Sequence, residues 1–204
     1  MLLFDKYGIK VYGRPLPDGS TDRGPRRLLA EKAAIKQLMK EAFAGKTIPR
    51  IDHHGSGAPF LTLPTGPEDG EDASLPAISV SHCRPMAAIA LAPHGVKVGI
   101  DCESGDRLAQ LDRVAPRFLS ARQMPYWGRR PATLWAWSLK EALYKAAQRP
   151  GLPLECIPLP LEVPVGDTTP DSSVNIAGED FQTLQIDIAP LPAVLMLAFS
   201  AKMG

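Results

Sequence analysis

The stretch Val96-Lys-Val-Gly-Ile-Asp-Cys-Glu103 alternates apolar residues with small or charged ones. This period of two predicts a β-strand, because successive side chains of a strand point to opposite faces. One predicted face carries Val96, Val98, Ile100 and Cys102. The other carries Gly99, Asp101 and Glu103, and we expect Gly99 to leave that face open beside Asp101.

Two carboxylates at this spacing indicate a cation site. Asp101 and Glu103 lie about 7 Å apart along one strand face, and their oxygens can converge on one ion. Two acids this close repel each other unless a cation or a proton intervenes. Oxygen ligands favour Mg²⁺ or Mn²⁺ over zinc. The alternative is a strand end with two solvated acids, a common arrangement for so short a motif.

A second stretch, Trp135-Ala-Trp-Ser-Leu-Lys-Glu-Ala-Leu-Tyr-Lys145, predicts a helix. Trp137, Glu141 and Lys145 then form one stripe, while Leu139 and Leu143 point toward a core. Glu141 and Lys145 could form an ordinary surface pair worth about 0.3–0.5 kcal/mol. Alternatively, Glu141 gives a third carboxylate to the cation and the Lys145 ammonium faces phosphate.

Working outward, apolar periodicity and turn residues predict an α+β fold. Each half of the chain holds a helical part and a small antiparallel sheet, which predicts two similar lobes, 1–95 and 96–204, although no internal repeat is visible. Residues 64–75 are expected to form a polar loop. The expected helices are 26–43, 107–119 and 132–148. The expected strands are 9–12, 48–53, 77–81, 87–91, 96–103, 154–163, 181–188 and 193–199.

Composition excludes several classes of protein. The 204 residues are 45% hydrophobic and 22% charged, with a net charge of +1, which argues against disorder. No signal peptide is visible, and the apolar run from Ala193 to Phe199 is too short for a membrane span. The three cysteines have no metal spacing, so we expect reduced thiols in a cytoplasmic protein.

Charge is unevenly distributed along the chain. Residues 104–150 hold nine Lys or Arg against three Asp or Glu, whereas residues 151–204 hold one Lys against seven acids. A basic block in a neutral protein indicates an acidic partner or a phosphorylated ligand, or else a solvated helix face. The block has no aromatic platform or reader motif, which argues against nucleic-acid binding.

Several motifs together resemble those of the 4′-phosphopantetheinyl transferases. Val98-Gly-Ile-Asp-Cys-Glu103 and Trp137-Ser-Leu-Lys-Glu-Ala-Leu-Tyr-Lys145 resemble the paired signature of that family. Ile78-Ser-Val-Ser-His82, Gly57-Ala-Pro-Phe-Leu61 and Arg117-Phe-Leu-Ser120 resemble its further motifs, in matching order from about residue 25 to residue 151. The length is similar to that of the surfactin-synthetase-activating type, a monomer of two pseudo-symmetric lobes.

The resemblance implies Mg²⁺-dependent (or Mn²⁺-dependent) transfer of phosphopantetheine from coenzyme A to a serine of a carrier protein, releasing 3′,5′-ADP. It implies that Asp101, Glu103 and Glu141 are the metal ligands. Glu141 is then the best general-base candidate, since a serine must lose its proton to attack. Lys145 would neutralise the departing nucleotide as a point charge on phosphate.

The resemblance also assigns coenzyme A contacts. His82, with Ser81 beside it, resembles the residue that contacts the 3′-phosphate, while Lys32 and Arg27 on the first helix are further candidates for the nucleotide phosphates; their alternative is a solvated helix face. His53 and His54 are expected to be a loop pair rather than a metal site.

Two positions depart from the family pattern. Ala58 replaces the usual lysine of the Gly-Lys-Pro motif, and Arg50 or Arg84 could compensate for the lost phosphate contact. Gln123 replaces a frequent acid.

For the partner, we expect an acidic acyl or peptidyl carrier protein, which Arg113, Arg117 and Arg122 would face. The alternatives are a coenzyme A-binding homologue without transferase activity and a Mg²⁺-dependent phosphohydrolase. No partner membrane or nucleic acid is expected.

Overall fold

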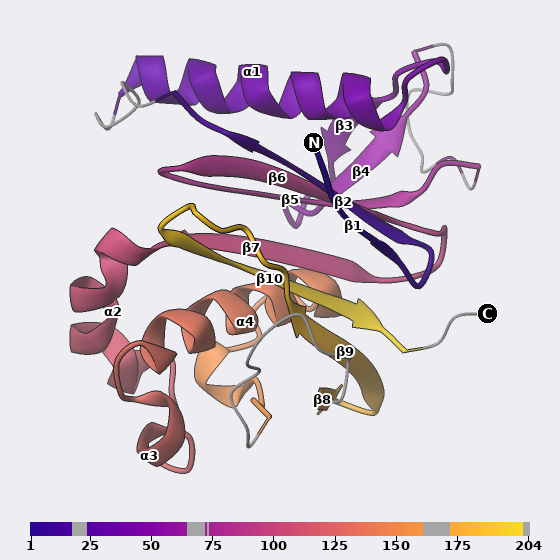
Figure 1. The fold of residues 1–204 in the computed structure, drawn as a ribbon. Coiled ribbons are helices and arrows are strands. Elements are labelled where there is room, and N and C mark those ends of the chain that lie inside the picture. The colour runs from indigo at the N-terminus through magenta and orange to yellow at the C-terminus, as the bar shows by residue number, and fades with distance from the viewer. Residues whose placement is uncertain (18–23, 65–71, 73, 161–171, 202–204) are drawn as a thin grey trace.

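The computed structural model describes residues 1–17, 24–64, 72, 74–160 and 172–201. Two four-stranded antiparallel sheets lie face to face between helices, which gives the α+β architecture that the sequence predicts (Figure 1). The first sheet has the strand order β1-β2-β6-β5, and the second has the order β7-β10-β9-β8. A separate hairpin pairs β3 with β4.

The first sheet and its helix come from the first 92 residues. Helix α1 (Pro25–Ala42) lies along the outer face of this sheet (Figure 1). Because α1 carries apolar side chains at helical spacing, Leu38 and Met39 are buried against the sheet. The strands are β1 (Leu2–Lys6), β2 (Ile9–Pro15), β3 (Arg50–His53), β4 (Pro59–Thr62), β5 (Ala77–Cys83) and β6 (Met86–Ala92).

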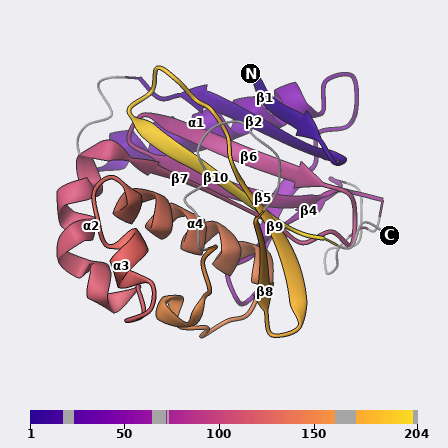
Figure 2. The same cartoon turned by 60° about the horizontal axis from the view of Figure 1, so that its bottom comes forward.

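The second sheet begins directly after the turn at Gly95. Its strands are β7 (Val98–Ser104), β8 (Ser172–Ile176), β9 (Glu179–Gln185) and β10 (Ala193–Ser200). The helices α2 (Leu108–Val114), α3 (Met124–Trp127) and α4 (Ala132–Ala147) gather on its outer face (Figure 2). Short 3-10 turns cover Gly105–Arg107, Ala115–Arg117 and Leu154–Cys156.

Three apolar cores separate four layers. Alternation along β6 sends Ala87, Ile89 and Leu91 toward α1 and the intervening residues toward the second sheet. Along β10, Leu195 and Leu197 face the first sheet. Phe199 faces the same way, whereas Met196 and Ala198 pack on the helix side of the second sheet. The order of layers is therefore helix, sheet, sheet, helix, and β7 lies in the middle of the molecule.

Most predicted elements are present, with corrections at their ends. Strand β1, the hairpin strand β4, helix α3 and strand β8 were not predicted. The strand predicted over 154–163 is wrong for 154–160, where the structure has a 3-10 turn and irregular chain, and 161–163 lie outside the described residues. The predicted helix 107–119 is shorter, ending as α2 at Val114. Of the predicted loop 64–75, residues 65–71 and 73 lie outside the description.

Two further observations bear on the sequence predictions. Among the described residues, none of the helices is both long and apolar enough to cross a membrane. The three cysteines are free thiols, as predicted. The lobe boundary between residues 95 and 96 stays a prediction, and the two main sheets draw their strands from opposite sides of it.

Candidate functional site

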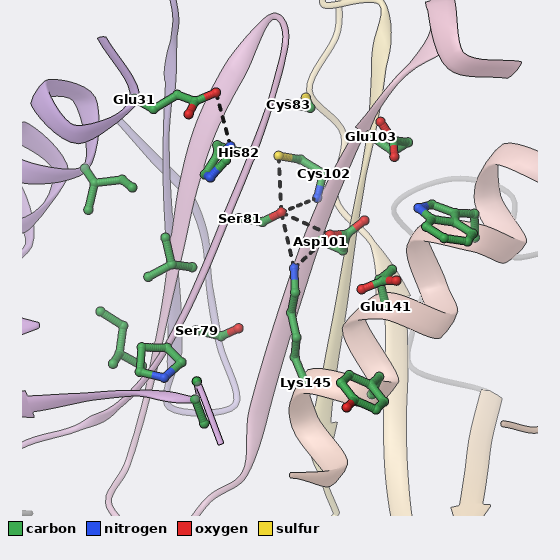
Figure 3. A pocket seen from close by; sticks show the side chains of 18 of the residues that line it. Glu31, Ser79, Ser81, His82, Cys83, Asp101, Cys102, Glu103, Glu141 and Lys145 are labelled. Carbon is green, nitrogen blue, oxygen red and sulfur yellow. Dashed lines mark hydrogen bonds and ion pairs between the residues drawn. The ribbon is translucent and has the colours of Figure 1, made fainter. Parts of the chain in front are cut away.

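A pocket of about 1020 Å³ opens between α1, the end of β5, strand β7 and helix α4. It is lined by most of the residues that the sequence analysis selected, including Ser81, His82, Asp101, Glu103, Glu141 and Lys145. Figure 3 shows these side chains converging from both sheets and from α4. The site therefore lies where the two halves of the chain meet.

Two serines of β5 connect the sheets beneath the pocket. The Ser79 hydroxyl accepts a hydrogen bond from the backbone N–H of Ile100 at 3.0 Å, and the Ser81 hydroxyl accepts one from that of Cys102 at 3.1 Å. Both serines are buried, and they meet β7 at the same two-residue spacing. Side-chain oxygens thus replace strand carbonyls as acceptors, which fixes the position of β7 against β5.

Asp101 lies at the centre of a polar network (Figure 3). Its Oδ1 accepts hydrogen bonds from the Ser81 hydroxyl at 3.1 Å and from the Lys145 ammonium at 2.8 Å. The same ammonium donates to the Ile100 carbonyl at 2.9 Å. On the α4 side, the Ser138 hydroxyl donates to the backbone carbonyl of Asp101 at 3.0 Å. Asp101 is therefore held by residues from both halves of the chain.

Glu103 is the second carboxylate of this strand face. It forms an ion pair with Arg107, four residues later, and accepts a hydrogen bond from the Ser104 backbone N–H at 2.9 Å. The Arg107 guanidinium also lies over the Trp137 ring, 5.7 Å from its centroid. Burial raises the pKa of Glu103, although Arg107 opposes the effect and Asp101 adds to it.

Glu141 brings a third carboxylate to the pocket from α4. Burial raises its pKa, and the neighbouring Asp101 raises it further, against the opposing influence of Lys145 and Arg107. In Figure 3 its side chain lies next to Asp101, one helical turn from Lys145. The Glu141–Lys145 pairing that the sequence offered as an alternative is not formed, since the Lys145 ammonium donates to Asp101.

The donor set fits a magnesium-like ion in its chemistry. Three carboxylates line one pocket, and hard oxygen donors suit Mg²⁺. As the side chains stand, however, no group of three His, Cys, Asp or Glu residues in the described ranges is gathered closely enough to hold a metal. Lys145 and Arg107 instead neutralise Asp101 and Glu103.

The opposite wall of the pocket is cationic. Arg27 and Lys32 from α1 line it together with His82 at the end of β5. Glu31 lies among them with a side chain only 7% exposed, bonded to Arg27 and His82. Lys32 and His82 are exposed and Arg27 is half-buried, so all three can be reached by a ligand. Ser81, in contrast, is buried and its hydroxyl is engaged with β7.

Gly99 does not leave the strand face open, which corrects the sequence prediction. A Cβ at this position would lie 1.9 Å from the carbonyl oxygen of Ala142 and 2.5 Å from the backbone nitrogen of Ala146. Gly99 therefore permits α4 to approach β7 closely, as its lack of a Cβ allows. This approach brings Glu141 and Lys145 over the strand that carries Asp101.

Sequence reasoning missed several residues of the site. Glu31, Arg107 and Ser79 line the pocket but were not singled out. Outside the pocket lining, Lys140 of α4 was missed as well; its buried ammonium donates to the carbonyls of Leu154 and Ile157 at 2.7 and 2.6 Å. Desolvation lowers the pKa of Lys140 to about 8. Arg27 and Glu31 are four residues apart on a predicted helix, and this spacing could have indicated their ion pair from the sequence.

The positions that depart from the expected motifs are also placed. Ala58 lines the pocket beside His53. Arg84 lines it too but pairs with Asp106 at 2.7 Å, whereas Arg50 is exposed outside the lining. Gln123 has a structural contact, because its amide donates to the Ile157 carbonyl at 2.9 Å.

The two neighbouring histidines and the arginines of the basic block lie in different parts of the molecule. His54 lies in a loop, as predicted, and stacks on Phe60 with a centroid distance of 4.3 Å. His53, in contrast, ends strand β3 and lines the pocket, which corrects the prediction for this residue. Among the described pocket-lining residues, Arg113, Arg117 and Arg122 are absent, and all three are exposed.

Residues 97–185 match a family model described as the 4′-phosphopantetheinyl transferase superfamily. The matched range runs from β7 to β9 and contains Asp101, Glu103, Glu141 and Lys145. A search of curated proteins found no match.

Proposed function

We propose that this chain, which carries a domain of the 4′-phosphopantetheinyl transferase superfamily over residues 97–185, transfers 4′-phosphopantetheine from coenzyme A to a serine of an apo carrier protein. The observation that carries the proposal is the division of one pocket into an acidic and a cationic wall. Asp101, Glu103 and Glu141 form the first, and Arg27 and His82 belong to the second.

Each wall suits a different part of coenzyme A. The nucleotide end carries phosphate groups, which the Arg27, Lys32 and His82 side chains can neutralise. A bound cation would offset the repulsion between the carboxylates of the acidic wall and the pyrophosphate oxygens. Asp101, Glu103 and Glu141 would hold Mg²⁺ or Mn²⁺ there, and the ion would neutralise charge that develops on the pyrophosphate oxygens during transfer.

The protein residues then divide the reaction between them. The serine hydroxyl of the carrier attacks the phosphorus nearest the pantetheine, and the bond from that phosphorus to the bridging oxygen breaks. The serine proton passes to the Glu141 carboxylate, whose burial and raised pKa make it a stronger base than a solvated glutamate. The 3′,5′-ADP leaves with the bridging oxygen, and its negative charge is balanced by the Lys145 ammonium.

We further infer that this protein is of the surfactin-synthetase-activating type and works as a cytoplasmic monomer. The exposed arginines at 113, 117 and 122 would attract an acidic acyl or peptidyl carrier by charge. Because Ala58 contributes no cation, the cationic wall depends more on α1 and His82.

A mass-spectrometric assay tests the transfer. The protein is incubated with coenzyme A, Mg²⁺ and an apo carrier, and the carrier should gain the mass of one phosphopantetheine. Glu141→Gln should slow the gain at least about a hundredfold, the lower range for removing a general base. Glu155→Gln, an exposed glutamate outside the pocket lining, is the matched control and should leave the rate unchanged.

The same assay separates the competing functions. Coenzyme A that is hydrolysed while the carrier stays unmodified would indicate a phosphohydrolase. Coenzyme A that is bound but unchanged would indicate a binding homologue without transferase activity. Either result overturns the proposal. Independently of activity, Asp101→Asn should weaken Mn²⁺ binding measured by electron paramagnetic resonance, and an unchanged affinity would remove Asp101 from the metal site.

A further inference from the structure

We propose that Glu31 is a positioning residue that aligns Arg27 and His82 as a two-armed clamp for the terminal phosphate monoester of coenzyme A. This inference rests on the proposed function, since it concerns the same pocket. The residue itself does not touch the ligand. It acts through the two side chains, of Arg27 and His82, that it holds against the pocket wall.

The burial of Glu31 separates it from an ordinary surface acid. Its side chain is 7% exposed, although Lys32 and Ala33 beside it on α1 are exposed to solvent. A buried carboxylate is costly unless it is paired and hydrogen-bonded. At this site the pairing is provided by groups that also line the pocket, so the ion pairs and the pocket wall are one structure.

A single oxygen organises both partners. Glu31 Oε1 accepts a hydrogen bond from Arg27 Nε at 2.7 Å, one helical turn earlier on α1. The same oxygen lies 3.2 Å from His82 Nδ1, which comes from strand β5 (Figure 3). Glu31 therefore ties a helix side chain to a strand side chain, and the relative position of the two arms is fixed by one atom.

The nitrogens that contact Glu31 determine which nitrogens of Arg27 and His82 are left for a ligand. Arg27 binds Glu31 through Nε, so its terminal nitrogens Nη1 and Nη2 are not spent on this contact. His82 binds through Nδ1, which leaves Nε2 on the far side of the ring. Arg27 then presents N–H donors that a phosphate monoester accepts, and His82 presents its second ring nitrogen.

The sign of the charge favours a positioning role. An acid on a phosphate-binding wall lowers the attraction for phosphate by itself, so Glu31 would be unfavourable if it only added charge. It is favourable if it orders two flexible side chains, because the ligand then does not have to immobilise them on binding. A purely structural link between α1 and β5 is the competing explanation, and it predicts no dependence on the phosphate.

Isothermal titration calorimetry with coenzyme A and dephospho-coenzyme A tests the inference, because the two ligands differ by the terminal phosphate. Glu31→Gln should weaken coenzyme A binding on the order of tenfold and leave dephospho-coenzyme A binding unchanged. In the transfer assay KM for coenzyme A should rise while kcat stays the same. Equal weakening of both ligands would show a structural role and overturn the proposal.

Glu41→Gln is the matched control. Glu41 lies on the same helix and forms an ion pair of the same kind, with Arg14 at 2.6 Å, but it does not line the pocket. It should leave both affinities unchanged. If Glu31→Gln does not fold, Glu31→Asp keeps the charge but shortens the reach, and the same selective loss is expected from it.

A double-mutant cycle with His82→Ala gives a second test. In the His82→Ala background the effect of Glu31→Gln on coenzyme A should shrink, because one of the two arms is already gone. Fully additive effects would contradict the clamp. Wild-type protein that binds both ligands equally would overturn the assigned coenzyme A orientation, and with it the clamp. Wild-type discrimination that survives in Glu31→Gln would overturn the clamp alone.

Discussion

Replacing Gly99 with alanine should separate helix α4 from strand β7. The added Cβ would lie 1.9 Å from the Ala142 carbonyl oxygen and 2.5 Å from the Ala146 nitrogen, whereas ordinary contact begins at 3.4 Å. The obstructing atoms are helix backbone and cannot rotate away. Helix and strand would therefore have to move apart by about 1.5 Å, which loses much of the dispersion energy of the contact.

The magnitude follows from what this contact buries. Leu139 and Leu143 are completely buried between α4 and the second sheet, and a shift of the helix loosens both. Overpacking a core usually costs about 1–3 kcal/mol, and occasionally more. Because rigid backbone must move here, we expect a loss of about 3–5 kcal/mol in the free energy of unfolding for Gly99→Ala.

Urea unfolding followed by tryptophan fluorescence measures this loss. With a urea dependence of about 2 kcal/mol per molar, the midpoint should fall by roughly 1.5–2.5 M. Gly55→Ala is the control, because its Cβ would meet no atom within 4 Å, and it should change the stability by less than about 0.5 kcal/mol. A Gly99→Ala midpoint within about 0.3 M of the wild type would refute the reasoning.

Three further predictions concern buried polar groups. Ser79→Ala and Ser81→Ala should each cost about 1–3 kcal/mol in urea unfolding, because each leaves a buried backbone N–H of β7 without its acceptor. Glu141→Gln should stabilise the metal-free protein at pH 7.5. Burial raises the pKa of Glu141 in the folded protein above 4.5, so the wild type loses stability as the pH rises through that folded-state pKa. The gain in stability over the wild type should vanish below pH 4.5, and a gain independent of pH would show that the charge of Glu141 is not its cause. Lys140→Met should flatten the rise in urea midpoint between pH 8 and 10.5, because the folded protein releases the proton of this lysine at about 8 and the unfolded chain at 10.5. An unchanged rise would contradict the prediction.

Local pattern predicted the elements that carry the chemistry. Alternation in β7 gave the apolar face of Val98 and Ile100 and the opposite face of Asp101, and the helical period of α4 correctly sent Leu139 and Leu143 into the core. Such patterns are visible because the residues of one face recur within a single element.

Contacts between distant segments were not predictable in this way. The Ser79 and Ser81 hydroxyls bond backbone atoms twenty-one residues later, and Glu31 of α1 meets His82 of β5 on one wall of the pocket. Gly99 was misjudged for the same reason: its sequence neighbours do not reveal that a helix more than forty residues later packs on it. In each case the partner is chosen by the packing of layers.

The predicted strand over 154–163 shows a different source of error. Ile157 and Leu159 alternate as in a strand, but the carbonyls of Leu154 and Ile157 are bound by the Lys140 ammonium instead of a neighbouring strand. A buried cation thus satisfies backbone acceptors that a sheet would otherwise satisfy. Sequence periodicity does not distinguish these two solutions.

The three carboxylates of the pocket are balanced differently, and this has a consequence for cation binding. Asp101 and Glu103 each contact a cation of the chain, Lys145 and Arg107, while Glu141 forms no ion pair with a described residue. The Lys145 ammonium contacts Oδ1 of Asp101, so it would compete with a divalent ion for the charge of this carboxylate. The same ammonium would attract an incoming phosphate. Removing Lys145 should therefore tighten Mn²⁺ binding to the free protein while weakening that of coenzyme A, opposite effects that a simple loss of structure would not produce.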